Sequence, residues 1–278
     1  MANALPPHVW FCVSAIFHYL GPAFAVLLFA QVGVLGMAWL RIASAALIFA
    51  PLTRPWTVFA RADRPTRLLL LAFGACLAVM NCAFYLALDR LPISLVAAIE
   101  FVGTIGVALV GLRSRRNVAA LAVAVAGTLL LIDIKWSSDP VGLFWAFLNG
   151  SLFVGYIVLG HRIAQTGISI AGLGTAMAIA FIVVLPIGFS EALPAFSAPA
   201  LLVAAIGVGI CSSVIPYICD QLAMARLPRA SFALMLSLLP LTATLIGVIV
   251  LRQVPSLTDC LGIALVVAGI AIHKPAPE

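Results

Sequence analysis

Long apolar runs separated by short polar segments follow one another along the whole chain; two of them cover residues 68–88 and 201–218. A helix needs about twenty apolar residues to cross the hydrocarbon core of a bilayer. A barrel strand would instead alternate in polarity over about ten residues. Proline, glycine and charged clusters between the runs predict ten transmembrane helices. We expect them over 9–29, 34–52, 68–88, 92–111, 117–133, 141–159, 170–189, 199–221, 229–250 and 257–273.

The composition agrees with this pattern, because 64% of the residues are hydrophobic and only 9% are charged. Soluble domains carry about a quarter charged residues, so this chain cannot cover itself with a polar surface. In lipid every backbone polar group must be satisfied internally, which favours an all-α integral membrane protein. The net charge of +6 lies in short loops, so we expect no nucleic acid partner. No cleavable signal peptide is evident, and the first apolar run is expected to remain as a helix.

The distribution of arginine and lysine among the loops predicts the orientation. If the N-terminus is inside, eleven basic residues fall in inside loops and only Arg90, Lys135 and Arg252 fall outside. Positive charge is enriched in cytoplasmic loops. We therefore expect a multi-pass protein of the cell inner membrane with both termini in the cytoplasm. The inside residues are Arg54, Arg61, Arg64, Arg67, Arg113, Arg115, Arg116, Arg162, Arg226, Arg229 and Lys274.

A short repeat divides the chain into two similar halves. The segment Ala87-Leu-Asp-Arg-Leu-Pro92 recurs as Ala223-Met-Ala-Arg-Leu-Pro228, each time in a short loop between predicted helices. The offset is close to half the chain, which predicts one five-helix repeat over 1–136 and another over 137–278. An odd number of helices in each half makes the two halves insert in opposite orientations. Inverted repeats of this kind are typical of secondary transporters, whose site lies near the midplane.

Two charged residues lie deep inside predicted helices. Glu100 is near the middle of the fourth helix and Arg41 near the middle of the second. A charge at the centre of the membrane costs about 3 kcal/mol or more, and such residues usually serve function. Glu100 is a candidate proton carrier or amine partner, and Arg41 a candidate anchor for a carboxylate. The alternative is a buried ion pair that only locks two helices together.

Other polar groups inside the predicted helices are candidates to line a cavity. His18 and Tyr19 precede Gly21-Pro22, where the first helix can bend. Asn81 and Tyr85 share one face of the third helix, and Asn149 and Tyr156 share one face of the sixth. The alternative for the two pairs is hydrogen bonding between helices without a ligand. For His18, a hydrogen bond to a carbonyl freed by the proline is slightly favoured.

The eighth predicted helix carries the segment Ser212-Ser-Val-Ile-Pro-Tyr217. Pro216 frees the carbonyl four residues earlier, and Ser213 or Tyr217 is expected to line the opening. Asp220 lies one turn further on. We interpret it as the solvated end of the helix, where a charge costs little.

Several motifs of other protein classes are missing from the sequence. The chain has no Walker A loop, no HExxH or GxSxG motif and no cysteine and histidine cluster. We therefore expect neither ATP-driven pumping nor an enzyme, and neither a cofactor nor a metal. The expected partners are a small-molecule substrate, protons and membrane lipid.

In order and spacing, the motifs of this chain resemble the drug/metabolite transporter superfamily, and within it the EamA-type exporters near the bacterial threonine/homoserine exporter group. The segments that carry the resemblance are Trp39-Leu-Arg-Ile42, residues 84–103, Ile215-Pro-Tyr217, Ala225-Arg-Leu-Pro-Arg229, Leu236-Ser-Leu-Leu-Pro240 and residues 261–269. The chain departs from the family pattern where Thr104 follows Gly103, where Leu251-Arg-Gln253 stands, and where Leu239 precedes the proline.

The resemblance implies a secondary transporter that exports amino acids or similar metabolites by alternating access, driven by the proton gradient. The residues expected at its site are Glu100, Arg41, Tyr85, Asn81, His18, Tyr156 and Tyr217. Two alternatives remain open from the sequence: a facilitator or uptake carrier with the same fold, and a membrane scaffold that transports nothing.

Overall fold

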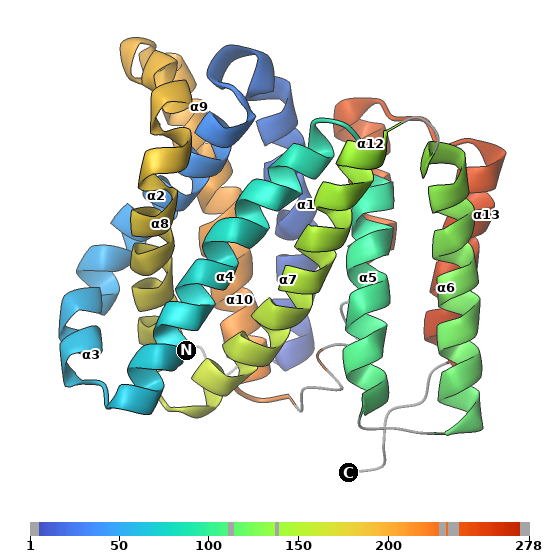
Figure 1. Cartoon of the computed structure of the whole chain (residues 1–278), viewed down its shortest axis with the longest axis horizontal. Helices are drawn as coiled ribbons and strands as arrows, with labels where there is room; N and C mark the ends of the chain where they lie inside the picture. Colours follow the sequence, from blue (N-terminus) through green and yellow to red (C-terminus); the bar gives the residue numbers. More distant parts are fainter. Residues whose placement is uncertain (1–5, 111–113, 137–138, 228–231, 233–238, 273–278) are drawn as a thin grey trace.

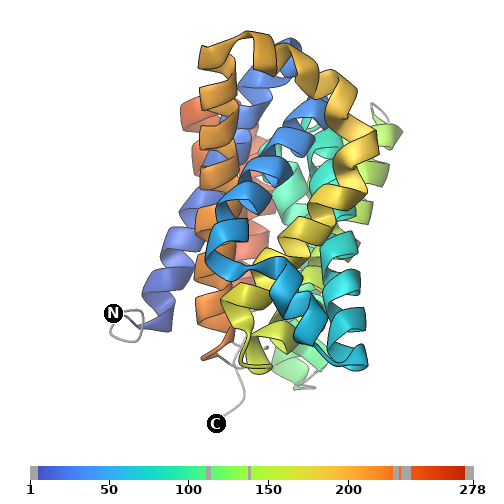
Figure 2. The same ribbon diagram turned by 90° about the vertical axis from the view of Figure 1, so that its left-hand side faces the viewer.

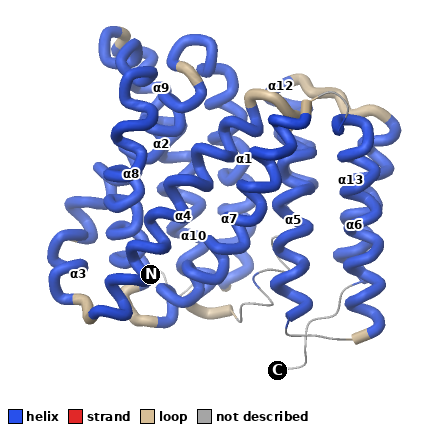
Figure 3. The backbone as a smooth tube through the Cα atoms, in the orientation of Figure 1, coloured by secondary structure: helices blue, strands red, loops and turns tan. Residues whose placement is uncertain are grey.

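The structure, a computed structural model, describes residues 6–110, 114–136, 139–227, 232 and 239–272. The described residues form helices joined by short loops, without a strand (Figure 3). The first part of the chain comprises α1 (Pro7–Val32), α2 (Val34–Thr53), α3 (Pro55–Arg61), α4 (Arg64–Leu88), α5 (Ile93–Val110) and α6 (Arg115–Trp136). The second part comprises α7 (Pro140–Gln165), α8 (Ser169–Ser197), α9 (Pro199–Gly209), the π-helix η1 (Ile210–Val214), α10 (Ile215–Met224), α12 (Leu239–Leu251) and α13 (Leu257–Ile272).

Six of the described helical segments are long and apolar enough to cross a membrane: Val9–Val32, Val34–Thr53, Arg64–Leu88, Pro140–Gln165, Ser169–Ser197 and Pro199–Met224. The described part of the chain adds shorter apolar helices at Ile93–Thr104, Val118–Gly127, Leu239–Leu251 and Leu257–Gly269. The predicted helix over 229–250 coincides with α12 from Leu239 onward, and most of its earlier part lies outside the described residues. The short helix α3 was not predicted.

Local sequence signals set several helix ends. Asp63 accepts a hydrogen bond from the N–H of Thr66 at the start of α4, and Asp139 accepts one from the N–H of Gly142 at the start of α7. Such N-caps satisfy backbone donors that have no partner within the helix. Gly33 separates α1 from α2 with a φ of 79°, a conformation that glycine adopts without steric cost.

The outer surface of the bundle is apolar while polar residues are buried. Leu47, Ile182 and Val203 are about 70% exposed, whereas Arg41, Glu100 and Asp220 are at most 2% exposed. This distribution is the inverse of that in a soluble protein and fits a bundle whose outer face contacts lipid.

Helices that are distant in sequence pack side by side throughout the bundle. Figure 1 shows α6 and α13 together at one edge, and α4 and α7 crossing the middle; both pairs are in contact. The helix α2 packs along α8, and α1 packs on α10 and α12. Figure 2 shows α9, η1 and α10 as one continuous column beside α1. These contacts bring polar residues from α1, α2, α4, α5, α7 and α10 into the centre of the bundle.

Candidate functional site

All four tyrosines of the chain are completely buried in the bundle. Tyrosines of membrane proteins are usually enriched at the two interfaces, where the hydroxyl reaches water. Here Tyr19, Tyr85, Tyr156 and Tyr217 instead lie among buried polar and charged side chains. A buried hydroxyl needs a hydrogen-bond partner, so these residues mark a polar centre inside an apolar protein.

Arg41 of α2 is the buried cation of this centre. Its Nε donates to Ser213 Oγ at 2.7 Å, and its Nη2 donates to the carbonyl of Ser212 at 2.7 Å and to the Tyr217 hydroxyl at 3.3 Å. The guanidinium carbon also lies 5.3 Å from the centre of the Tyr85 ring. Within the described part of the chain no carboxylate forms an ion pair with Arg41, and its Nη1 has no hydrogen-bond partner. The cation is thus held by neutral groups, with one donor unused.

The backbone of η1 and α10 supplies one of these groups. Pro216 has no N–H, so it cannot bond to the carbonyl of Ser212 four residues earlier, as the sequence predicted. That oxygen accepts from Arg41 instead. The π-helical turn spans the same residues, and such turns occur frequently at functional sites.

Glycine permits the close helix packing that places this turn. A Cβ added at Gly21 of α1 would lie 2.6 Å from both Cβ and N of Ser212. A Cβ at Gly209 would collide with Ser44 Oγ of α2. Both helices therefore approach η1 more closely than an alanine at either position would allow.

Glu100 of α5 lies in a second cluster. Its Oε2 accepts from the Tyr19 hydroxyl of α1 at 2.6 Å, and its Oε1 accepts from Asn149 Nδ2 of α7 at 2.6 Å. The other amide atom, Asn149 Oδ1, is buried without a partner. A carboxylate and an unpaired carbonyl oxygen therefore lie at one place, and they are the hydrogen-bond acceptors that an ammonium group requires.

Asp220 of α10 forms a third cluster. Its Oδ1 accepts from Ser14 Oγ of α1 at 2.5 Å, and its Oδ2 accepts from the Tyr156 hydroxyl of α7 at 2.6 Å. The residue is 0% exposed, so its interpretation as a solvated helix end was wrong. The helix continues to Met224, and packing against α1 and α7 encloses the carboxylate.

The two acidic clusters share a pattern. Each carboxylate receives one hydroxyl from α1 and one polar group from α7, so each connects these two helices. On α1, Ser14 and Tyr19 are separated by about 7.5 Å along the axis, at 1.5 Å per residue. On α7, Asn149 and Tyr156 are separated by about 10.5 Å. The clusters therefore lie at two levels of the bundle.

Aromatic rings connect the three clusters. The ring centres of Tyr156 and Tyr217 lie 5.4 Å apart, and the Tyr217 hydroxyl accepts a hydrogen bond from Arg41. In the Glu100 cluster, the ring centre of Tyr19 lies 6.4 Å from that of Phe84, and the Phe84 ring centre is 6.0 Å from the guanidinium carbon of Arg41. Arg41 therefore lies between the acidic clusters and is bonded to neither carboxylate.

The structure distributes the predicted residues over the three clusters. Arg41, Tyr85, Asn81 and Tyr217 form one cluster, since Tyr217 donates to Asn81 Oδ1 at 3.2 Å and the Tyr85 ring centre lies 5.3 Å from the guanidinium carbon. Glu100 and Tyr156 belong to the two acidic clusters. The predicted alternative of a Glu100–Arg41 ion pair is not formed in this conformation.

The ring of His18 makes edge contacts with Tyr19 at 5.4 Å and Phe153 at 5.5 Å. No hydrogen bond joins it to a carbonyl of another described residue, which was the use expected for it.

The sequence prediction missed Ser14; it named Tyr19 and Asn149 as candidates to line a cavity but not among the residues expected at the site. A serine or tyrosine in an apolar helix carries no sign of which neighbour it faces. The available signal was weaker: Ser14 and Tyr19 lie in the same apolar run as His18.

Comparison with known proteins gives three results. The profile of the EamA-like transporter family matches residues 140–273. The threonine/homoserine exporter RhtA of Salmonella typhimurium is 31% identical over 253 residues, which cover 90% of this chain and 84% of that protein. The RhtA protein of Escherichia coli K12 is 30% identical over the same shares. A solved crystal structure with 20% identity superposes with a TM-score of 0.61 and covers 96% of this chain and 95% of its own.

Proposed function

Since this chain belongs to the EamA-like transporter family, we propose that it exports small neutral amino acids, as the name of its relatives RhtA indicates for threonine and homoserine. The family consists of transporters and not of enzymes, and the chain is a multi-pass membrane protein of the bacterial inner membrane.

The observation that carries the proposal is the buried guanidinium of Arg41, which forms an ion pair with no carboxylate among the described residues. A buried charge is costly when unpaired. The α-carboxylate of an amino acid would supply the missing charge, and the unused Nη1 would donate to it. Neutral groups hold the guanidinium in place before the substrate arrives.

The ammonium end of the substrate is assigned to the Glu100 cluster. Glu100 supplies negative charge and Asn149 Oδ1 supplies an acceptor that no protein group uses. An amino acid carries its two charges on neighbouring atoms, so a site for it needs a cation and an anion within one cavity. Glu100 accepts from Tyr19, whose ring centre lies 6.4 Å from that of Phe84, and the Phe84 ring centre lies 6.0 Å from the guanidinium carbon of Arg41, so we assign the site to the region around these two rings.

Alternating access between two inverted halves, 1–136 and 137–278, is the proposed mechanism. The repeated loops are 136 residues apart in the sequence. Shifting the residue numbers of α4 by this offset gives the range of α9, η1 and α10, and shifting those of α2 gives a range within α8. The helix α1 packs on α10 as α7 packs on α4. Asn81 and Tyr217 are themselves 136 positions apart and share a hydrogen bond. This correspondence supports ten helices related by a pseudo-twofold axis near Arg41, with the halves rocking around it.

The basic loops support an orientation with both termini in the cytoplasm. In that orientation the start of α1 and the end of α7 lie on the cytoplasmic side. The Asp220 cluster is then on the inner side of Arg41 and the Glu100 cluster on the outer side.

The test is a binding and transport assay on purified protein, with L-threonine as the probe. Wild type should bind threonine more tightly than threonine amide, which lacks the carboxylate, or a dihydroxybutyrate, which lacks the amine. Arg41→Lys should lose about tenfold or more in affinity, because a point charge replaces the planar donors. Glu100→Gln should lose preference for the amine.

Arg90→Gln serves as the matched control, because Arg90 is exposed and bonded only to Asp139 among the described residues. Unchanged proton-coupled threonine efflux in Glu100→Gln would refute the assignment of Glu100. Equal binding of threonine and its amide by wild type would refute the role of Arg41. Saturable flux is absent if the protein is only a scaffold, and counterflow without response to a pH gradient identifies a facilitator.

A further inference from the structure

The Asp220 cluster differs from the Glu100 cluster in what surrounds the carboxylate. Ser14 Oγ lies 2.5 Å from Asp220 Oδ1 and 3.3 Å from the carbonyl of Pro216. This hydroxyl therefore has two acceptors in reach. It donates to Asp220 when the carboxylate is charged. When Asp220 carries a proton, Ser14 can accept that proton's hydrogen bond and donate its own hydrogen to Pro216.

Glu100 has no such provision. Its Oε1 is bonded to an amide NH2, which donates and cannot accept. Its Oε2 is bonded to the Tyr19 hydroxyl, for which no second acceptor lies among the described residues. A proton on Glu100 Oε2 would leave the Tyr19 hydroxyl without an acceptor, and a proton on Oε1 would be accepted only if the Asn149 amide turned to present its Oδ1, so the cluster as it stands suits a carboxylate facing an ammonium group.

The two clusters are also too far apart to hold one small group together. Their partners on α1 differ by about 7.5 Å along the axis, and those on α7 by about 10.5 Å. No described side chain is bonded to both carboxylates. Asp220 thus has no evident role in holding the substrate that Arg41 and Glu100 would bind.

We propose that Asp220, with Ser14 and Tyr156, is a proton-binding site separate from the amino-acid site. This inference rests on the proposed function, because it names the group that couples export to the proton gradient. The step is simple: a proton from water forms an O–H bond at Asp220 Oδ1, and Ser14 turns its hydrogen to the Pro216 carbonyl. Release to water on the other side reverses both changes, and no other bond forms or breaks.

The helices packed around Asp220 carry several other titratable groups. On α10 itself are Tyr217 and Cys219, and α7 provides Tyr156 with His161 and Arg162 further toward its end. The helix α1 provides His18 one turn beyond Ser14, and α8 carries only Glu191, which is bonded to the start of α2. Arg41 of α2 reaches this cluster only through Tyr217. None of these forms an ion pair with Asp220 among the described residues.

Tyr156 and Tyr217 connect the Asp220 cluster to Arg41 of the proposed substrate site. Tyr156 donates to Asp220 and lies 5.4 Å from Tyr217, which accepts from Arg41. Hydrogen bonds to a charged acceptor are about twice as strong as those between neutral groups. Protonation therefore weakens the bond from Tyr156 and loosens the connection between α1 and α7 at this level. Those two helices also hold Glu100, so the change reaches the amine site.

The test compares two activities of purified protein in liposomes, again with L-threonine as probe. Counterflow measures exchange without net proton movement, and accumulation driven by an imposed pH gradient measures coupling. Asp220→Asn keeps the shape and removes the charge. It should slow counterflow by no more than about threefold and reduce driven accumulation more than about tenfold. Asp89→Asn, at an exposed position on the same chain, should leave both unchanged.

Driven accumulation at the wild-type level in Asp220→Asn would overturn the inference. So would a folded variant that has lost counterflow, since Asp220 would then belong to the substrate path. Wild type with counterflow but without a response to the pH gradient would overturn the proton site and identify a facilitator, while the amino-acid site at Arg41 and Glu100 would stand. Wild type without counterflow would overturn the proposed function itself.

If Asp220→Asn does not fold, Tyr156→Phe decides the matter. This change keeps a ring stacked on Phe153 and Phe73 and removes one donor to the carboxylate. The charged form loses a bond, so the pH midpoint of driven accumulation should move up by about one unit. An unchanged midpoint would overturn the inference.

Discussion

The contact between α1 and the π-helical turn gives the sharpest structural prediction. In Gly21→Ala the new Cβ would lie 2.6 Å from Cβ and N of Ser212, where apolar atoms prefer about 3.5–4.0 Å. Relief requires α1 and η1 to separate by about 1 Å, because one of the atoms in contact belongs to the backbone. Overpacking of this kind costs about 1–3 kcal/mol. The shift also moves the Ser212 carbonyl, which accepts from Arg41 at 2.7 Å.

We expect Gly21→Ala to unfold at a lower temperature in detergent and to bind threonine more weakly. Gly207→Ala is the matched control, since a Cβ there meets nothing within 4 Å. It should be neutral or stabilising by at most about 1 kcal/mol, the difference between glycine and alanine in a helix. Equal stability and affinity in Gly21→Ala and wild type would refute the account of this contact.

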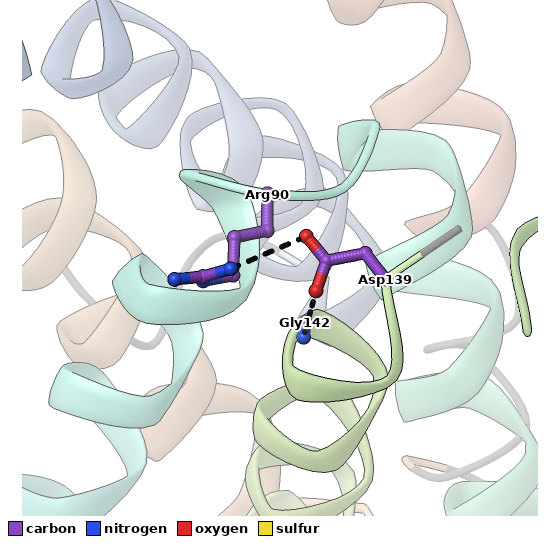
Figure 4. Close-up of polar contacts among 3 residues, drawn as sticks. All are labelled: Arg90, Asp139 and Gly142. Carbon is purple, nitrogen blue, oxygen red and sulfur yellow. Dashed lines mark hydrogen bonds and ion pairs between the residues drawn. The ribbon is translucent and has the colours of Figure 1, made fainter. Parts of the chain in front are cut away.

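Four further substitutions test other contacts. Pro216→Ala restores an N–H that competes for the Ser212 carbonyl, and threonine affinity measured by calorimetry should fall by up to about tenfold; unaltered affinity would contradict the role given to this oxygen. Glu191→Ala removes the carboxylate that accepts from two N–H groups at the start of α2, at 3.0 and 3.2 Å, and should lower thermal stability by about 0.5–1 kcal/mol. Asp139→Ala should lower the free energy of unfolding by about 1 kcal/mol, because Asp139 caps α7 (Figure 4). Arg90→Ala should lower it by less than about 0.5 kcal/mol, because the ion pair between Arg90 and Asp139, at 3.4 Å, is exposed. Equal losses in a denaturation series would show that the ion pair and not the cap stabilises this turn.

The positions of the apolar helices could be predicted because long apolar segments are stable only away from water. A run of residues such as 68–88 has no other stable place than a membrane or a protein core. The ends were less certain: α8 continues to Ser197, beyond the predicted 189, because neither Pro186 nor Glu191 interrupts it. Proline usually ends a helix, but α8 continues past Pro186.

The polar contacts were harder to predict for a different reason. Depth along a helix follows from sequence, and it correctly marked Arg41 and Glu100 as buried. The partner of a buried group depends on how helices far apart in the chain pack. Asp220 looked like a helix end because nothing in its own segment shows that Ser14 and Tyr156 enclose it.

The carbonyl of Ser212 has a consequence for comparing members of this family. This oxygen can accept from a guanidinium because Pro216 has no N–H to donate to it. An apolar residue, Pro216, thereby makes the Ser212 carbonyl available as an acceptor. Two relatives with the same polar side chains can therefore differ in what their centres bind if one lacks the proline. Comparisons of cargo preference should record helix-interior prolines alongside charged residues, because a substitution that hydropathy treats as silent can change the chemistry of the pocket.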